Sequence, residues 1–262
     1  MVSIAIVTVT YNAEQDIEKT LNSVVIQDYP NIHYYVLDGK STDNTLNILM
    51  RYKTLFSNAG MDYLVTCKRD HGIFDAMNAS LEFINEDYVL FLNAGDYLAD
   101  VHVISYVENY LNQNECDICY GDFYAYNNNK RKKAIAREAF ELPDGMMTAH
   151  QAIFTKVDLL RKHKYQTKYS MAADYHFYLN MFLLGKKFLH FHKIIVYFQI
   201  GGISQRKAKL TQNEVVEIKK ELLKLDDKRV RKLKRKIHYI CWRKRLISYL
   251  PSFMRYYRYE NF

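Results

Sequence analysis

The strongest constraint on the fold is an alternation of short apolar segments and helical patterns in the first hundred residues. Residues 3–10 form a nearly unbroken β-branched run, typical of a strand buried in a parallel sheet. Behind it, Asn12 is a candidate helix cap, and Ile17, Leu21 and Val24 follow at helical spacing. Strands that alternate with helices of this length predict an α/β fold with right-handed crossovers and a mostly parallel sheet.

The rest of the chain continues this pattern and then changes it. Further strands are expected at 33–37, 63–66, 88–92, 152–155 and 187–198. Helices are expected through 46–52, from 73 to 83, from 101 to 111, from 173 to 184 and from about 210 onward. Residues 117–126 and 132–137 are instead predicted to form a hairpin around the polar turn 127–129.

Charge divides the chain into two parts. Residues 1–218 contain 22 Lys and Arg against 25 Asp and Glu, whereas residues 219–262 contain 15 against 4. A chain of 262 residues is long enough for one sizeable domain with an appendage. We therefore expect a folded domain over 1–208 and a basic amphipathic helical tail over 209–262.

Several protein classes are disfavoured. The chain has no uncharged stretch of roughly 20 apolar residues, and its first residues lack the features of a signal peptide. Its four cysteines make no disulfide framework, so reduced thiols and a cytoplasmic location are expected. Neither a G-x-G-x-x-G motif after the first strand nor a Walker loop is present, which weakens a dehydrogenase or another nucleotide-binding class.

Acidic residues follow the predicted strands where apolar runs end. Asp38 ends the second strand, Asp70 and Asp75 flank the start of a helix, and Asp96 follows the fourth strand. The carboxyl ends of parallel strands meet at one edge of the sheet, where ligands bind in α/β folds. This pattern predicts a pocket for a nucleotide and a metal ion. The alternative is that Asp38 and Asp43 only cap a turn and the next helix.

The order and spacing of these motifs resemble those of inverting family 2 glycosyltransferases with the GT-A fold, of the bacterial surface-polysaccharide type. The motifs are Thr10-Tyr-Asn12, Asp38-Gly-Lys-Ser-Thr-Asp43, Arg69-Asp-His-Gly-Ile-Phe-Asp-Ala-Met-Asn78 and Leu92-Asn-Ala-Gly-Asp96. The resemblance covers about the first 205 residues. It implies a Rossmann-like sheet flanked by helices, with a nucleotide-sugar-binding half at 1–100 and an acceptor-binding half at 101–208.

The resemblance also implies donor-site roles. Asp96 would bind Mn²⁺ or Mg²⁺ bridging the donor phosphates. Donor contacts would come from Thr10, Tyr11, Asn12, Asp38, Arg69, Asp70, Asp75, Asn78, Asn93 and Ala94. The last motif departs from the family pattern, since it has one acid where three are common. A weaker metal shell is expected, with Gly95 allowing a phosphate to approach closely.

The resemblance implies acceptor-side roles as well. Ala172-Ala-Asp174-Tyr-His176 is similar to the family's catalytic-base motif, so Asp174 would take the proton of the acceptor hydroxyl. The alternative is that Asp174 only stabilises a helix N-terminus. His150 and Gln151 would contact the acceptor sugar. The loop 201–204 with Arg206 and Lys207 is either a basic lid over the diphosphate or a plain turn.

The basic tail suits an anionic membrane surface. Residues 228–236 are almost all Lys or Arg, and apolar residues recur from Ile237 to Tyr257. A nucleic-acid patch or a helix packed on the domain are the alternatives. A lipid-linked acceptor would require membrane attachment, whereas the acidic catalytic half would repel nucleic acid, so no nucleic-acid partner is expected.

Together these features predict an inverting transferase that moves a sugar, preferably from a UDP-sugar, to a polyprenyl-diphosphate-linked glycan. The product would be O-antigen lipopolysaccharide, capsule or exopolysaccharide, and the protein would lie peripherally on the inner face of the cytoplasmic membrane. The alternatives are another nucleotide-binding enzyme, such as a nucleotidyltransferase, and a nucleic-acid-binding protein that uses the tail.

Overall fold

The structure, a computed structural model, describes residues 1–29, 31–127 and 130–248. It divides into two compact units, the first spanning Met1–Arg206 and the second beginning at Lys207. The expected boundary at 208 lies two residues further along. The division of the first unit into a donor half and an acceptor half stays a prediction.

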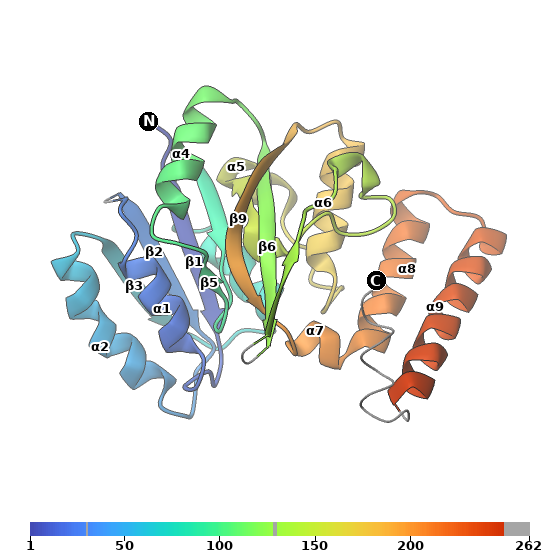
Figure 1. Ribbon diagram of the computed structural model, residues 1–262, viewed down its shortest axis with the longest axis horizontal. Helices are drawn as coiled ribbons and strands as arrows, with labels where there is room; N and C mark the ends of the chain where they lie inside the picture. Colours follow the sequence, from blue (N-terminus) through green and yellow to red (C-terminus); the bar gives the residue numbers. More distant parts are fainter. Residues whose placement is uncertain (30, 128–129, 249–262) are drawn as a thin grey trace. The chain divides into compact units, whose positions relative to one another are not determined.

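The first half of the sheet is parallel (Figure 1). It contains β1 (Ile4–Thr10), β2 (Ile32–Asp38), β3 (Asp62–Cys67) and β4 (Tyr88–Phe91), in the order β3-β2-β1-β4. Every residue of β1 and β4 is buried, as the unbroken apolar runs predicted. This arrangement confirms the predicted α/β fold and brings the carboxyl ends of β1, β2 and β4 to one edge.

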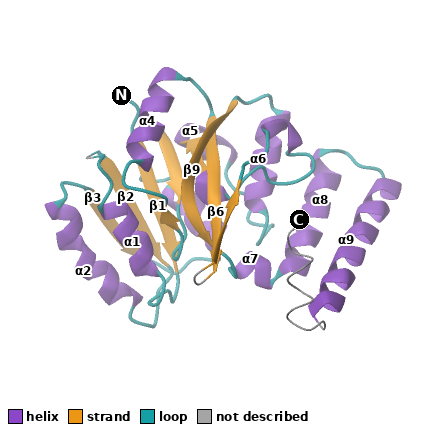
Figure 2. Cartoon of the chain, viewed as in Figure 1, coloured by secondary structure: helices purple, strands orange, loops and turns teal. Residues whose placement is uncertain are grey.

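Helices connect and flank these strands (Figure 2). They are α1 (Ile17–Val25), α2 (Thr45–Asn58), α3 (Ile73–Ser80) and α4 (Val103–Gln113). The prediction that Asn12 caps α1 is wrong, because Asp16 is the residue before the helix. Asn12 instead has φ +49°, and its side-chain oxygen accepts a 2.8 Å hydrogen bond from Thr42 N. A short polar side chain is among the few that tolerate this left-handed conformation.

The second half of the sheet is mixed. Its strands are β5 (Tyr97–Leu98), β6 (Ile118–Asn127), β7 (Lys130–Ala134), β8 (Ile153–Lys156) and β9 (Phe188–Gln199). The sheet continues from β4 as β8-β6-β9-β5, with β8 antiparallel to both of its neighbours and β9 parallel to β6. The hairpin prediction is confirmed by the antiparallel β6–β7 pair, although two residues of its turn lie outside the described residues.

Shorter elements complete the first unit. They are the 3₁₀ turns η1 (Ala139–Glu141) and η2 (His150–Ala152) and the helices α5 (Val157–His163), α6 (Ala173–Leu183) and α7 (Ile203–Arg206). The segment 201–204 is a turn followed at once by the exposed helix α7, which agrees with the plain-turn alternative, and the lid role stays a prediction. Most of α6 is buried, and its first turn carries Asp174. That position brings a carboxylate from the second half of the chain into the neighbourhood of η2.

The second unit contains α8 (Ala208–Leu222) and α9 (Asp227–Ser248). The helical tail thus begins two residues before the expected Leu210. Val216, Ile218 and Val230 are buried, whereas all the Lys and Arg side chains from 228 to 235 are exposed. The expected apolar positions from Leu250 to Tyr257 lie outside the described residues. No described helix is long and apolar enough to cross a membrane.

Candidate active site

A cleft of about 790 Å³ opens at the edge of the sheet where β1 and β4 end. It is lined by residues of the first unit, including those that follow both strands. The predicted site residues among its walls are Thr10, Tyr11, Asn12, Asn93, Ala94, Asp96, His150, Gln151 and Asp174. Motifs from both halves of the first unit therefore meet around one cavity.

The acids of the second and third motifs do not line this cleft. Asp38, at the end of β2, is only 1% exposed and accepts hydrogen bonds from Ser41 N at 2.8 Å and from Ser41 Oγ at 2.5 Å. Asp70 Oδ1 accepts from Gly72 N at 2.9 Å, and Asp75 Oδ2 accepts from His71 N at 3.0 Å. These carboxylates stabilise turns, which was the alternative interpretation for Asp38. Their donor-binding role stays a prediction.

Two further predicted donor residues also lie outside the cleft walls. Asn78 on α3 donates to Tyr165 O at 2.8 Å and accepts from Tyr165 N at 2.9 Å, so both ends of its amide bind backbone. Arg69 lies exposed on the loop after β3. The donor-binding roles of both residues stay predictions.

The first motif lies at the cleft rim. Tyr11 directly follows β1 and is 62% exposed, so its ring is available to a planar ligand. Thr10 is 7% exposed and its hydroxyl has no hydrogen-bond partner in the described residues. An unpaired hydroxyl in the wall of a cleft suits a polar ligand, because a buried polar atom without a partner is costly.

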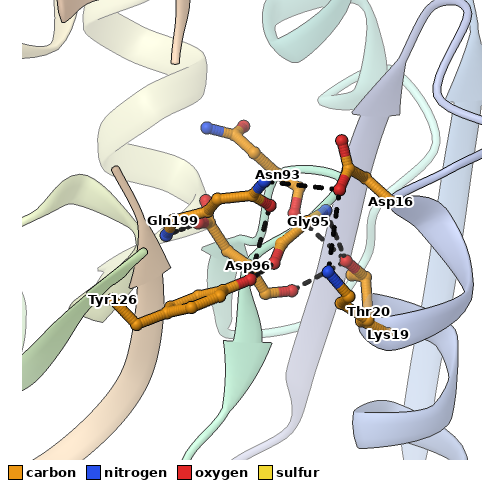
Figure 3. A network of polar contacts seen from close by, with 8 residues as sticks. All are labelled: Asp16, Lys19, Thr20, Asn93, Gly95, Asp96, Tyr126 and Gln199. Carbon is orange, nitrogen blue, oxygen red and sulfur yellow. Dashed lines mark hydrogen bonds and ion pairs between the residues drawn. The ribbon is translucent and has the colours of Figure 1, made fainter. Parts of the chain in front are cut away.

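The turn after β4 is held by a network of polar contacts (Figure 3). Gly95 N donates to Thr20 Oγ1 at 2.9 Å, and Thr20 Oγ1 in turn donates to Asp96 O at 2.7 Å. The Asp96 carboxylate accepts from Gln199 N and from Gln151 Nε2, each at 2.7 Å. Asp96 is 4% exposed, and this burial raises the pKa of its carboxyl to about 7.

Gln199 fills the space beside Gly95. A Cβ on Gly95 would lie 2.3 Å from Gln199 Oε1, and Gly95 has φ +97°. The Nε2 of Gln199 donates to Asp16 Oδ1 at 3.3 Å. Tyr126 OH donates to Gly95 O at 2.5 Å and lies 3.3 Å from Gln199 Oε1. In this structure the Gln199 amide occupies the space beside Gly95, and the expected approach of a phosphate to Gly95 stays a prediction.

The oxygen atoms around Asp96 include several that could bind a divalent cation. Within the described part of the chain, no cluster of three or more His, Cys, Asp or Glu side chains is placed to hold a metal ion. However, the amide oxygens of Asn93 and Gln151 are buried without a partner, and Gln151 is bonded to Asp96 through its nitrogen. A hard cation takes few protein carboxylates together with neutral oxygens and phosphates. The donor set therefore fits a site with a single carboxylate.

The acceptor side of the cleft is connected to this turn. Asn93 Nδ2 lies 3.1 Å from His150 Nε2, and His150 Nδ1 lies 3.5 Å from Asp174 Oδ2. The other carboxylate oxygen of Asp174 accepts from Tyr175 N at 2.8 Å. His150 and Asp174 side chains are each 17% exposed. The candidate base is thus partly shielded, and it faces the cleft from the first turn of α6.

The sequence analysis missed several residues of this site. Gln199 ends the last strand just as Asp38 ends the second, but it belongs to none of the motifs in the sequence. Asp16 accepts from Gln199 and Tyr126 donates to Gly95 O, and no local pattern marks either residue. Arg137 and the segment 146–149 also line the cleft. Arg137 and residues 146–149 reach the cleft wall because the irregular segment between β7 and β8 folds back. Such a path leaves no repeating pattern in the sequence.

Comparison with protein families shows the family to which this chain belongs. The model of the family described as glycosyl transferase family 2 matches residues 5–185. The chain belongs to glycosyl transferase family 2. The match includes the turn after β4, His150, Gln151 and Asp174. The predicted enzyme class is confirmed at the level of the family.

Named relatives of this family 2 chain are bacterial glycosyltransferases. A poly(ribitol-phosphate) beta-glucosyltransferase of Bacillus spizizenii is 28% identical over 195 residues, which cover 70% of this chain and 30% of that enzyme. A PGL/p-HBAD biosynthesis glycosyltransferase of Mycobacterium bovis is 27% identical over 76% of this chain and 78% of its own length. The chain thus spans less than a third of the Bacillus enzyme but most of the mycobacterial one.

Solved structures show the same fold. S. aureus TarS 1–349 in complex with UDP matches with a TM-score of 0.64 at 16% identity, over 88% of this chain and 69% of that one. The mannosyltransferase PcManGT from Pyrobaculum calidifontis, in complex with GDP-Man and Mn²⁺, matches with a TM-score of 0.67 at 15% identity. The match covers 86% of this chain and 65% of that one. The predicted GT-A fold is confirmed by these likenesses.

Proposed function

We propose that this family 2 member is an inverting glycosyltransferase that uses a nucleotide-sugar, preferably a UDP-sugar. The observation that carries the proposal is that the turn Asn93–Asp96 and Asp174 line one cleft and are linked through His150. Support for the nucleotide comes from TarS, which has been solved with UDP and with UDP-GlcNAc. PcManGT was solved with GDP-Man, so a guanine nucleotide is the competing choice.

The reaction follows from the place of each group. The acceptor hydroxyl enters beside Asp174, which takes its proton while the oxygen attacks the anomeric carbon. The leaving diphosphate departs on the opposite face, so the configuration at that carbon inverts. Tyr11 lies exposed at the rim and would pack against the base of the nucleotide. Within the described residues the Thr10 hydroxyl has no partner, and it is available to a sugar or ribose hydroxyl.

Mn²⁺ or Mg²⁺ is the proposed cofactor. Asp96 would hold it, with the unpaired amide oxygens of Asn93 and Gln151 as neutral partners. When bound, the ion supplies neutralisation of the charge that develops on the leaving diphosphate. Gln199 keeps the Asp96 carboxylate oriented through its backbone N–H. Arg206, at the end of α7 in the cleft wall, is a further cation available to the diphosphate.

The proposed acceptor is a lipid-linked oligosaccharide of bacterial O-antigen, capsule or exopolysaccharide synthesis. The named relatives support a surface glycan, including a putative teichuronic acid biosynthesis glycosyltransferase of Bacillus subtilis that is 33% identical over 36% of this chain. The exposed cations of α9 support attachment to the inner face of the cytoplasmic membrane, because anionic lipids attract such a surface. The acceptor and the location are proposals.

Titration calorimetry with UDP, GDP and dTDP, each with and without Mn²⁺, tests the donor side. We expect one nucleotide to bind more tightly with Mn²⁺, and Asp96→Ala to lose that gain. Asp62→Ala is the matched control, since that carboxylate is 82% exposed and lies outside the cleft walls. Failure of all three nucleotides to bind would contradict the proposal, and metal-independent binding would remove the ion from it.

A further inference from the structure

His150 stands between the two sides of the cleft. It belongs to η2, which leads directly into β8, and β8 is paired with both β4 and β6. One ring nitrogen lies 3.1 Å from Asn93 on the turn after β4, and the other lies 3.5 Å from Asp174 on α6. The imidazole thus joins three elements that are far apart in the sequence. Both nitrogens face protein groups.

The neighbours of the ring select its tautomer. The nitrogen of an Asn side chain only donates hydrogen bonds, so His150 Nε2 accepts from Asn93 Nδ2. In the neutral ring the hydrogen must then be carried by Nδ1, which faces Asp174 Oδ2. The opposite tautomer would place two donors against each other at Asn93 and two acceptors against each other at Asp174. Asn93 therefore determines which His150 nitrogen donates.

The carboxylate of Asp174 is held at both oxygens. Oδ1 accepts from Tyr175 N, and Oδ2 faces the Nδ1–H of His150. A separation of 3.5 Å is long for a hydrogen bond, but contacts of catalytic groups are often long without substrate and tighten when it binds. Because Asp174 lines the cleft, this contact fixes how the carboxylate is presented to an incoming hydroxyl.

We propose that His150 is a positioning residue that orients Asp174 and ties it to the donor-side turn Asn93–Asp96. This inference rests on the proposed function, in which Asp174 is the base. It differs from the acceptor-binding role expected from the sequence, since neither ring nitrogen is left for a sugar hydroxyl. The link would orient the base from the same turn that contacts the donor, so that donor binding and base orientation are coupled.

Nitrogen NMR of protein labelled with ¹⁵N-histidine tests the tautomer without any substrate. The chain has nine histidines, and the His150 signals are those lost in His150→Asn. At mildly alkaline pH we expect the Nδ1–H tautomer, and Asn93→Ala should shift the ring toward the Nε2–H form. Asn47→Ala, on the exposed side of α2, is the control. An Nε2–H tautomer in the unmodified protein would overturn the proposal, as would an unchanged tautomer in Asn93→Ala.

Kinetics of three substitutions at position 150 test the effect on the base. Turnover is measured as UDP released from the best substrate among UDP-glucose, UDP-galactose and UDP-GlcNAc. His150→Ala should lower kcat about 100-fold with little change in donor KM, because misplacing a reacting group by 1 Å has about this effect. The Asn side chain can place its nitrogen near the former Nδ1, whereas Gln reaches toward the former Nε2. We expect the kcat of His150→Asn to be at least tenfold higher than that of His150→Ala, and the kcat of His150→Gln to stay close to that of His150→Ala.

The outcomes separate this proposal from the proposed function. Equal rates in the Asn and Gln variants, or a normal kcat in His150→Ala, would overturn the positioning role even if Asp174→Asn is inactive. Normal turnover in Asp174→Asn would instead remove the base from the proposed function. If no UDP-sugar is consumed, the tautomer measurement still decides whether His150 donates to Asp174. Thermal unfolding of each variant shows whether a loss of rate is a loss of folding.

Discussion

The backbone N–H of Gln199 donates a 2.7 Å hydrogen bond to Oδ1 of Asp96, joining residues 103 positions apart. Its side chain lies against Gly95 on the same turn. The last strand of the sheet therefore holds the turn that carries the site's buried acid. A side chain at position 95 would need the space that the Gln199 amide occupies.

Gly95→Ala should destabilise the protein through two separate effects. The φ of +97° costs an alanine about 1–3 kcal/mol, and its Cβ would displace the Gln199 amide, losing about a further 1 kcal/mol in hydrogen bonds. Gly201→Ala has a similar φ of +104° but nothing within 4 Å of its Cβ, so it isolates the backbone cost. Urea unfolding of both variants makes the comparison. Equal losses of unfolding free energy in Gly95→Ala and Gly201→Ala would mean that Gln199 does not occupy the space beside Gly95 in solution.

Asp96 should make stability depend on pH. Its pKa of about 7 in the folded protein is above the ordinary value of 3.8, so the folded state binds the proton more tightly between these values. Stability from this group is complete below about pH 4 and is lost as pH rises through 7, by as much as about 4 kcal/mol. The side-chain amide of Asp96→Asn does not titrate, so this variant lacks the pH-dependent contribution of position 96 to stability.

The melting temperature of Asp96→Asn, relative to the unmodified protein, should therefore rise from pH 4 to pH 8. The measurement is made with a chelator, so that no divalent ion stabilises the ionised carboxylate. A difference in melting temperature that is constant with pH would show that Asp96 is not protonated in the folded protein.

Tyr11→Ala should weaken nucleotide binding. Stacking of a base on an aromatic ring contributes about 1–3 kcal/mol, which corresponds to a loss of affinity of roughly tenfold to 100-fold. Tyr11 is 62% exposed at the cleft rim, so its replacement should leave the melting temperature almost unchanged. Tyr11→Phe keeps the ring and should retain affinity in the same calorimetric titration. Normal affinity in Tyr11→Ala would place the base elsewhere in the cleft.

Binding to anionic vesicles should depend on the cations of α9. Replacing Lys228, Arg231, Lys232 and Arg235 with Gln removes exposed charges at helical spacing, each contributing about 1 kcal/mol near such a surface. The matched control replaces Lys130, Arg131, Lys132 and Lys133 of β7, which are also exposed and carry the same charge. Co-sedimentation should fall only for the α9 variant. Equal losses of vesicle binding in the α9 and β7 variants would indicate that total charge, and not the position of the cations on α9, determines binding.

Strong local patterns were enough to predict most of the fold. The strand Ile4–Thr10 and the helix Ala173–Leu183 lie within a residue or so of their predicted bounds, because their burial follows from long apolar runs. Helix α5 was not predicted, since it has seven residues and only Val157, Leu159 and Leu160 are buried. The insertion of β8 between β4 and β6 was also missed, because pairings between distant strands leave no local period.

The candidate site was predictable only in its individual residues. Asp96, His150 and Asp174 were identified from motifs, and all three line the cleft. What the motifs do not contain is the contact of His150 with both Asn93 and Asp174, which depends on the order of β4 and β8 in the sheet. The bonds of Asp38 within its turn and of Asn78 to the backbone of Tyr165 were likewise not separable from ligand binding by sequence alone.

We propose sugar transfer from a nucleotide-sugar with inversion at the anomeric carbon. Real-time proton NMR of the sugar released from an α-linked UDP-sugar, with water as the acceptor, tests this stereochemistry. We expect the β-anomer to form first and Asp174→Asn to form it at least 100-fold more slowly. Initial release of the α-anomer, or an unchanged rate in Asp174→Asn, would contradict this proposal.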